Sequence, residues 1–125
     1  MKLLIAILAC FALVGCDMRL DMTRPQVQRK DLVGSYVYYS RDPADRATDH
    51  EWDHLTLYAD GKYVLVQGGP TKARSETAAV WRIDNFEGQG PELDLNHRGY
   101  PIYMKENKRI LMINGDTSIW YVKYK

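Results

Sequence analysis

The amino-acid sequence predicts an all-β protein, built as a single antiparallel up-and-down barrel or small sandwich of about eight short strands. Two observations indicate this fold class. Short segments of alternating apolar and polar residues follow one another from Leu32 to the end of the chain, and turns that contain Gly or Pro separate them. A run of strands with near-neighbour turns favours a barrel or sandwich, because both architectures protect the sheet edges.

The alternation predicts the individual strands in order. Strand-forming Val, Ile, Tyr and Thr recur within them, and the breaks contain Gly, Pro, Asn or Asp, which allow a chain to reverse. The predicted strands span residues 33–40, 54–59, 62–67, 78–84, 92–95, 100–105, 109–113 and 117–124.

The clearest unit is a hairpin around Asp60-Gly61. A two-residue Asp-Gly loop is typical of a type I′ turn, which sets the residues that face each other across the two strands. It pairs Tyr58 with Tyr63 and Leu57 with Val64. We therefore expect one face of the hairpin to point into the core, with the side chains of Leu55, Leu57, Val64 and Val66.

Residues 42–54 interrupt the strand pattern. Asp42 can cap a helix and Pro43 suits its first position, so we expect a short helix near Pro43 to Thr48. The sequence His50-Glu51-Trp52-Asp53-His54 follows and matches the H-E-x-x-H motif. On a helix, the two histidines of this motif bind one zinc ion and the glutamate acts as a general base, as in a zinc metalloprotease.

Two features weigh against a zinc site at His50, Glu51 and His54. The next predicted strand begins at His54, which leaves no residue for a connecting loop. In an extended chain the two histidines lie roughly 13 Å apart, too far to share a zinc ion bound at about 2.0–2.1 Å. We therefore expect a polar loop. A looser cation site is an alternative, although its spacing does not match the EF-hand loop; its carboxylates would be Asp42, Asp45, Asp49, Glu51 and Asp53.

The N-terminus has the layout of a secretory signal peptide. Lys2 precedes an apolar run, residues 3–14, that is shorter than the roughly 20 residues of a membrane-spanning helix. The run leads into Leu13-Val14-Gly15-Cys16, which resembles the lipobox of bacterial lipoproteins at all four positions. The resemblance implies cleavage before Cys16, a diacylglycerol on its sulfur and acylation of the new amine. Beyond this covalent lipid we expect no cofactor.

A lipoprotein of this kind is anchored to the cell membrane on its extracytoplasmic, periplasmic face, and two or more acyl chains make the anchor stable. Asp17 follows the lipidated cysteine, and in enteric bacteria an Asp there resembles the signal for retention in the inner membrane. The chain then divides into a signal peptide (residues 1–15), the lipidated Cys16 with a flexible tether (residues 16–31) and a β domain (residues 32–125).

Composition excludes several function classes. The only cysteines are Cys10, inside the signal peptide, and Cys16, so the mature domain has no disulfide, thiol nucleophile or cysteine metal ligand. Loss of Lys2 with the signal peptide leaves 16 basic and 16 acidic side chains, without a basic stripe. We therefore expect no nucleic-acid binding.

Three features of the β domain carry a second resemblance. They are the opening Leu32-Val33-Gly34-Ser35-Tyr36, the Leu-x-Leu-x-x-Asp-Gly-x-Tyr stretch from Leu55 to Tyr63, and Trp81 in a middle strand. Together they resemble lipocalin-like domains of bacterial lipoproteins. Such domains bind varied ligands and partners, so the resemblance implies a fold and leaves the function open.

The candidate binding residues are three aromatic side chains and one turn arginine: Trp120, Tyr58, Tyr63 and Arg98. Aromatic rings on an outer strand face offer contact area to a partner, and Arg98 can contact an anionic group. We expect no catalytic residue. Three functions stay open: a non-enzymatic binding or inhibitor/immunity module, with an envelope protein or small molecule as its partner; a zinc metalloprotease; and a structural component of the envelope.

Overall fold

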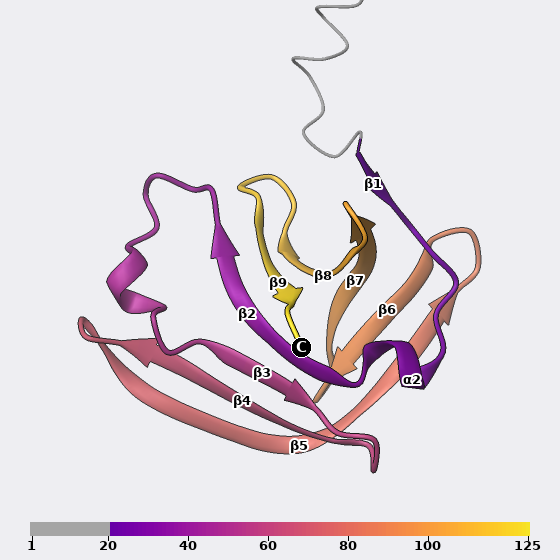
Figure 1. The fold of residues 1–125 in the computed structure, drawn as a ribbon, viewed down its shortest axis with the longest axis horizontal. Helices are drawn as coiled ribbons and strands as arrows, with labels where there is room; N and C mark the ends of the chain where they lie inside the picture. Colours follow the sequence, from indigo (N-terminus) through magenta and orange to yellow (C-terminus); the bar gives the residue numbers. More distant parts are fainter. Residues whose placement is uncertain (1–20) are drawn as a thin grey trace, which may run out of the picture.

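The computed structural model describes residues 21–125, which consist almost entirely of β-strands (Figure 1). The predicted signal peptide, the lipobox and Cys16 lie outside the described residues. Among residues 21–125, no helix has the length and apolar character needed to cross a membrane.

Eight strands close into an antiparallel up-and-down barrel (Figure 1). Each strand pairs with the next one in the chain, and β9 returns to pair with β2, which closes the ring. The all-β prediction is confirmed, and of the two expected architectures the barrel is the one formed. The strands are β2 (Gly34–Ser40), β3 (His54–Leu57), β4 (Lys62–Gly69), β5 (Lys72–Phe86), β6 (Gly90–Leu95), β7 (Arg98–Lys105), β8 (Lys108–Asn114) and β9 (Ile119–Lys123).

The hydrophobic core fills the barrel interior, where its largest side chains are Trp81, Tyr36 and Tyr121. The Trp81 indole N–H donates to the Tyr58 carbonyl oxygen (3.0 Å), and the Tyr36 hydroxyl donates to the Leu32 carbonyl oxygen (2.6 Å). Burial raises the pKa of Tyr36 and of Tyr121, so both hydroxyls stay neutral. The other buried core residues are Leu32, Leu55, Leu57, Tyr63, Leu65, Leu93, Leu95, Tyr100, Ile102 and Leu111.

The β3–β4 hairpin forms, but its register differs by one residue from the prediction. Leu57 faces Tyr63 instead of Val64. The loop contains three residues instead of two, because the Gly61 N–H donates to the Tyr58 carbonyl oxygen (3.1 Å) and Gly61 adopts a φ of +92°. A type I turn followed by a glycine in the left-handed region is a common three-residue hairpin loop.

The changed register exchanges the two faces of β4. Tyr63 and Leu65 point into the core, with exposed fractions of 2% and 9%. The predicted inward position of Val64 and Val66 is therefore wrong, whereas that of the two β3 leucines is confirmed. A shift of one residue has this effect because successive side chains of a strand point to opposite faces.

Strand β5 is longer than its predicted range, residues 78–84. Its first half, up to Val80, pairs with β4, and its second half, from Trp81, pairs with β6. Residues 72–77 are mostly polar and contain no apolar alternation, so they gave no strand signal in the sequence. They are held as a strand by their pairing with β4.

An N-terminal arm, residues 21–32, packs on the barrel. Its strand β1 (Met22–Thr23) pairs with β7, and its short helix α2 (Arg29–Leu32) ends on Leu32, which is fully buried in the core. Much of the segment expected to be a tether therefore contacts the domain.

Two arginines of the arm stack on aromatic rings of the barrel. The Arg24 guanidinium lies 4.7 Å from the ring centroid of Tyr103 and also donates to the Pro91 carbonyl oxygen (2.7 Å). The Arg29 guanidinium lies 4.2 Å from the Trp81 ring. Such cation–π contacts stabilise the packing of the arm on the barrel, although the sequence of the arm is mostly polar.

Between β2 and β3 the chain forms one 3₁₀ turn, η1 (Ala47–Asp49), where a short helix near Pro43 to Thr48 was expected. Asp42 does not cap a helix, because its carboxylate accepts a hydrogen bond from the nearby Ala44 N–H (2.9 Å). Aspartate commonly stabilises turns by such local bonds.

Leu32→Ala should lower the free energy of unfolding by about 2–5 kcal/mol, because it removes a fully buried side chain that joins the arm to the core. Denaturant unfolding measures this change. The control Val80→Ala, at an exposed position, should change the stability by less than about 0.5 kcal/mol. Equal effects of the two substitutions would show that the arm is not part of the cooperative fold.

Candidate functional site

The H-E-x-x-H segment does not form a helix, because His54 begins β3 and His50 follows η1 in a loop. Both ring nitrogens of His50 face carboxylates: Nε2 lies 2.8 Å from Asp45 Oδ1, and Nδ1 lies 2.8 Å from Asp53 Oδ2. The ring also stacks on Tyr38, with centroids 4.0 Å apart. The His50 ring is therefore held in place by three neighbouring side chains, namely two carboxylates and one tyrosine ring.

The two carboxylates beside His50 differ in their environment. The Asp53 side chain is 1% exposed, and its other oxygen accepts a hydrogen bond from the Gly68 N–H of β4 (2.7 Å). Burial raises the pKa of Asp45, but its hydrogen bond from the Tyr38 hydroxyl and the neighbouring His50 help to outweigh this effect, and the net pKa lies below the ordinary value. The network thus stabilises charge in a partly buried loop.

His54 has different partners. Its ring lies within hydrogen-bond distance of the Tyr124 and Thr56 hydroxyls. The two histidines therefore do not converge as the zinc-protease hypothesis requires. In the part of the chain that the structure describes, no group of three or more His, Cys, Asp or Glu side chains is placed to hold a metal ion.

Four acidic side chains of this loop are hydrogen-bonded to groups of the protein itself. Asp49 accepts a hydrogen bond from the Thr71 hydroxyl (2.6 Å), Asp42 accepts from the Ala44 N–H, and Asp45 and Asp53 face His50. These carboxylates hold the loop together and do not gather around one point, so the arrangement does not favour the looser cation site.

A second apolar cluster lies on the outer face of β8 and β9. Leu111 and Tyr121 point into the core, so their neighbours along each strand point outward. Three of these outward side chains, Ile110, Met112 and Trp120, are only 2–5% exposed. Partly buried side chains pack against them: Met22, Tyr103 and Val122.

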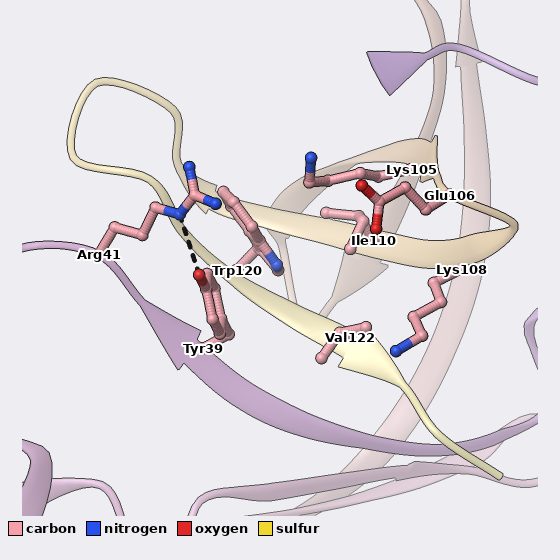
Figure 2. Close-up of a pocket in the computed structure, with 8 residues that line it drawn as sticks. All are labelled: Tyr39, Arg41, Lys105, Glu106, Lys108, Ile110, Trp120 and Val122. Atoms are coloured by element: carbon pink, nitrogen blue, oxygen red, sulfur yellow. Dashed lines mark hydrogen bonds between the residues drawn. The ribbon is translucent and has the colours of Figure 1, made fainter. Parts of the chain in front are cut away.

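A groove of about 240 Å³, named here the outer groove, opens over part of this cluster (Figure 2). Trp120 stacks on Tyr39 of β2, with ring centroids 4.9 Å apart, and the Arg41 Nε–H donates to the Tyr39 hydroxyl (2.9 Å). The pairing of β2 with β9 places Tyr39 opposite Trp120. The outer groove is lined by Tyr39, Arg41, Lys105, Glu106, Lys108, Ile110, Trp120 and Val122.

The rim of the outer groove carries three cations and one carboxylate. Arg41 lies at one end. At the other end lie Lys105, which ends β7, Glu106 of the β7–β8 turn, and Lys108, which begins β8 (Figure 2). Lys105 pairs with Asp21 at the start of the arm, and its hydrogen bond lowers the pKa of Asp21. Within residues 21–125, neither Arg41 nor Lys108 forms an ion pair.

The four binding residues predicted from the sequence do not gather at one place. Trp120 lies in the outer groove, whereas Tyr63 is buried in the core. Tyr58 is 47% exposed and precedes the β3–β4 turn. Arg98 begins β7, where its guanidinium lies 5.2 Å from the Tyr100 ring centroid.

The sequence interpretation missed Tyr39, Arg41, Lys105 and Lys108. One signal was present for Tyr39, because strand alternation places it on the face opposite to Tyr36 and Tyr38. The three cations carry no such signal: Lys105 and Lys108 face each other across the β7–β8 hairpin, and Arg41 reaches the same groove only when β2 pairs with β9.

Comparisons with protein-family models, with curated proteins and with solved structures find no match to this chain. Its function is therefore inferred from its own residues and their geometry.

Asp45→Asn should make the stability less dependent on pH. Because the folded-state pKa of Asp45 is lowered, its carboxylate stabilises the fold above the ordinary pKa of 3.8 and loses this contribution as the pH falls through the lower, folded-state value. At neutral pH, denaturant unfolding should give the variant a free energy of unfolding about 1.5–3 kcal/mol lower than that of the parent. This difference in stability should become smaller in acid.

Asp116→Asn, at an exposed position, serves as the matched control and should give little deficit at either pH. A deficit for Asp45→Asn that stays constant from neutral pH into strong acid would contradict the role of its charge.

Proposed function

We propose that the protein is a membrane-anchored bacterial lipoprotein that acts as a non-enzymatic binding module of the cell envelope. In this proposal its outer groove takes an anionic, partly apolar ligand at the membrane surface. The observation that carries the binding role is the Trp120–Tyr39 stack, which lies between Arg41 at one end and the β7–β8 lysines at the other. The lipobox that ends at Cys16 supports the anchor. An inhibitor or immunity factor is one form of such a module.

The chemistry of the outer groove suits a ligand that joins negative charge to apolar surface. The aromatic rings, Ile110 and Val122 offer apolar contact, and the cations attract an anion. Its volume, about 240 Å³, is below the roughly 300–1,000 Å³ usual for small-molecule pockets. One group of a larger ligand, such as a lipid head group, fits this size.

The arm supports binding close to the bilayer. Asp21 pairs with Lys105 on the rim of the outer groove, and Cys16 is five positions before Asp21. Five extended residues reach at most about 18 Å, whereas the 14 residues from 17 to 30 would reach roughly 45 Å if all of them were free and extended. A lipid on Cys16 therefore holds the outer groove near the membrane, and anionic phospholipid head groups are the ligand that we favour.

The loop around His50 supports a role without catalysis. A general base must be able to reach the proton that it removes from a substrate. In this loop Asp45 and Asp53 are each hydrogen-bonded to a ring nitrogen of His50, so these polar atoms already serve the fold.

Cys16→Ser should abolish lipid attachment, because the thioether requires the sulfur. The full chain, expressed in a bacterial host that is fed radioactive palmitate, should give a labelled band that the variant lacks. Cys10→Ser is the matched control and should keep the label, since Cys10 lies in the predicted signal peptide. An unlabelled parent chain would contradict the anchor, and a labelled Cys16→Ser would contradict its position.

Arg41→Gln and Lys108→Gln should each weaken binding to vesicles of phosphatidylglycerol and phosphatidylcholine by about fivefold. This is the effect expected when one basic side chain near an anionic surface is lost. Sedimentation of vesicles with residues 17–125, which lack the lipid, measures the affinity.

Lys72→Gln removes the same charge at the start of β5, away from the outer groove, and should bind like the parent. An equal loss in this control would indicate that net charge, and not the outer groove, drives binding. A parent that does not bind these vesicles would reject phospholipid as the ligand.

A further inference from the structure

The first half of β5 has an unpaired edge. Residues 72–80 pair with β4 on one side, while β6 pairs only with residues 81–86. Among residues 21–125 no strand lies on the other side of residues 72–80, and residues 72–78 are exposed. Figure 1 shows this stretch as the outermost strand beside β4.

The backbone of this edge presents hydrogen-bonding groups to solvent. The Trp81 N–H donates to the Gly61 carbonyl oxygen (2.8 Å), and the register between β5 and β4 is continuous over residues 75–80. Because alternate residues of an antiparallel strand point to alternate sides, the N–H and C=O groups of Glu76 and Ala78 point away from β4. Such a row of groups can pair with another strand.

The side chains of the edge favour a second copy of the same strand. Natural edges are often blocked by proline or by charges that repel a partner. Residues 72–80 contain no proline, and Arg74 and Glu76 carry opposite charges, with Nη1 and Oε2 3.5 Å apart within the chain. A copy of this strand therefore meets complementary charges if the register is right.

Charge selects one register for such a pair. When two β5 strands run antiparallel with Ser75 opposite Ser75, Arg74 of each copy lies directly opposite Glu76 of the other, twice by symmetry. A register centred on Glu76 instead places two carboxylates opposite each other, which is destabilising. The register centred on Ser75 also pairs the outward backbone groups of Glu76 with those of Arg74.

We propose that the free edge of β5 is a self-association surface, through which two copies of this chain form a symmetric dimer with Ser75 opposite Ser75. The two barrels are then joined by one continuous antiparallel ladder. The interface contains no residue of the outer groove, so it forms independently of ligand binding.

Ser75→Cys tests the register. In this dimer the two residues 75 form a pair without mutual hydrogen bonds, with Cα atoms about 4.5 Å apart, which is within the range of a disulfide. Mild oxidation of the purified full chain should give a disulfide-linked dimer on a non-reducing gel. The parent chain controls for Cys10 and Cys16 and should give none.

Thr77→Cys is the matched control, because residue 77 faces residue 73 of the other copy in this register. Its oxidation should give no dimer band. Cross-linking at position 77 in place of position 75, or at neither position, would overturn the proposal.

Arg74→Glu and Glu76→Arg test the charge pairing. Each single variant places like charges opposite each other twice and should raise the dimer dissociation constant about tenfold in analytical ultracentrifugation. The double variant restores opposite charges and should return to the parent value. Both side chains are half exposed, so the barrel should fold in every variant, which circular dichroism checks.

A parent chain that sediments as a monomer at every concentration would overturn the self-association surface. Failure of the double variant to recover the dimer would overturn the pairing of Arg74 with Glu76.

Discussion

The pairing of β2 with β9 is the contact on which the rest of the structure depends. It joins the first and last strands of the barrel and gives each of them an inner and an outer face. On the inner face Tyr38 lies opposite Tyr121, beside the core, and on the outer face Tyr39 lies opposite Trp120, in the outer groove. One ladder of backbone hydrogen bonds therefore forms the core and the candidate site together, so neither can be rearranged without the other.

The arm gives the outer groove a fixed relation to the N-terminal side of the chain. Leu32 is buried in the core, Arg24 stacks on a barrel tyrosine, and Asp21 pairs with Lys105 at the rim. The polar composition of this segment made it look like a tether, but arginine side chains bind aromatic faces without apolar sequence patterning. The length of chain left between the barrel and Cys16 is what brings the outer groove and the predicted anchor into one functional proposal.

Local sequence patterns were sufficient for the all-β class and for the approximate positions of the eight barrel strands, but not for the full length of β5 or for every register. Both faces of residues 63–66 are apolar, so their alternation does not distinguish Tyr63 and Leu65 from Val64 and Val66 as core residues. Asp60-Gly61 fits a two-residue and a three-residue loop, and packing in the closed barrel selects the second. The polar first half of β5 is a strand only because β4 pairs with it, which is a non-local cause that its own sequence does not contain.

The candidate site also depends on non-local contacts, which the local sequence does not reveal. A motif such as H-E-x-x-H specifies spacing along the chain, and that spacing brings two histidines together only on a helix. Here the chain is already extended at His54, so the motif separates its histidines, and His50 bonds to two carboxylates of its own loop. The outer groove has no motif at all, because Arg41 and Lys108 line its two ends only through strands that the barrel brings together. In a closed β-barrel, alternation predicts which face a side chain occupies, whereas its neighbours on that face depend on closure and register.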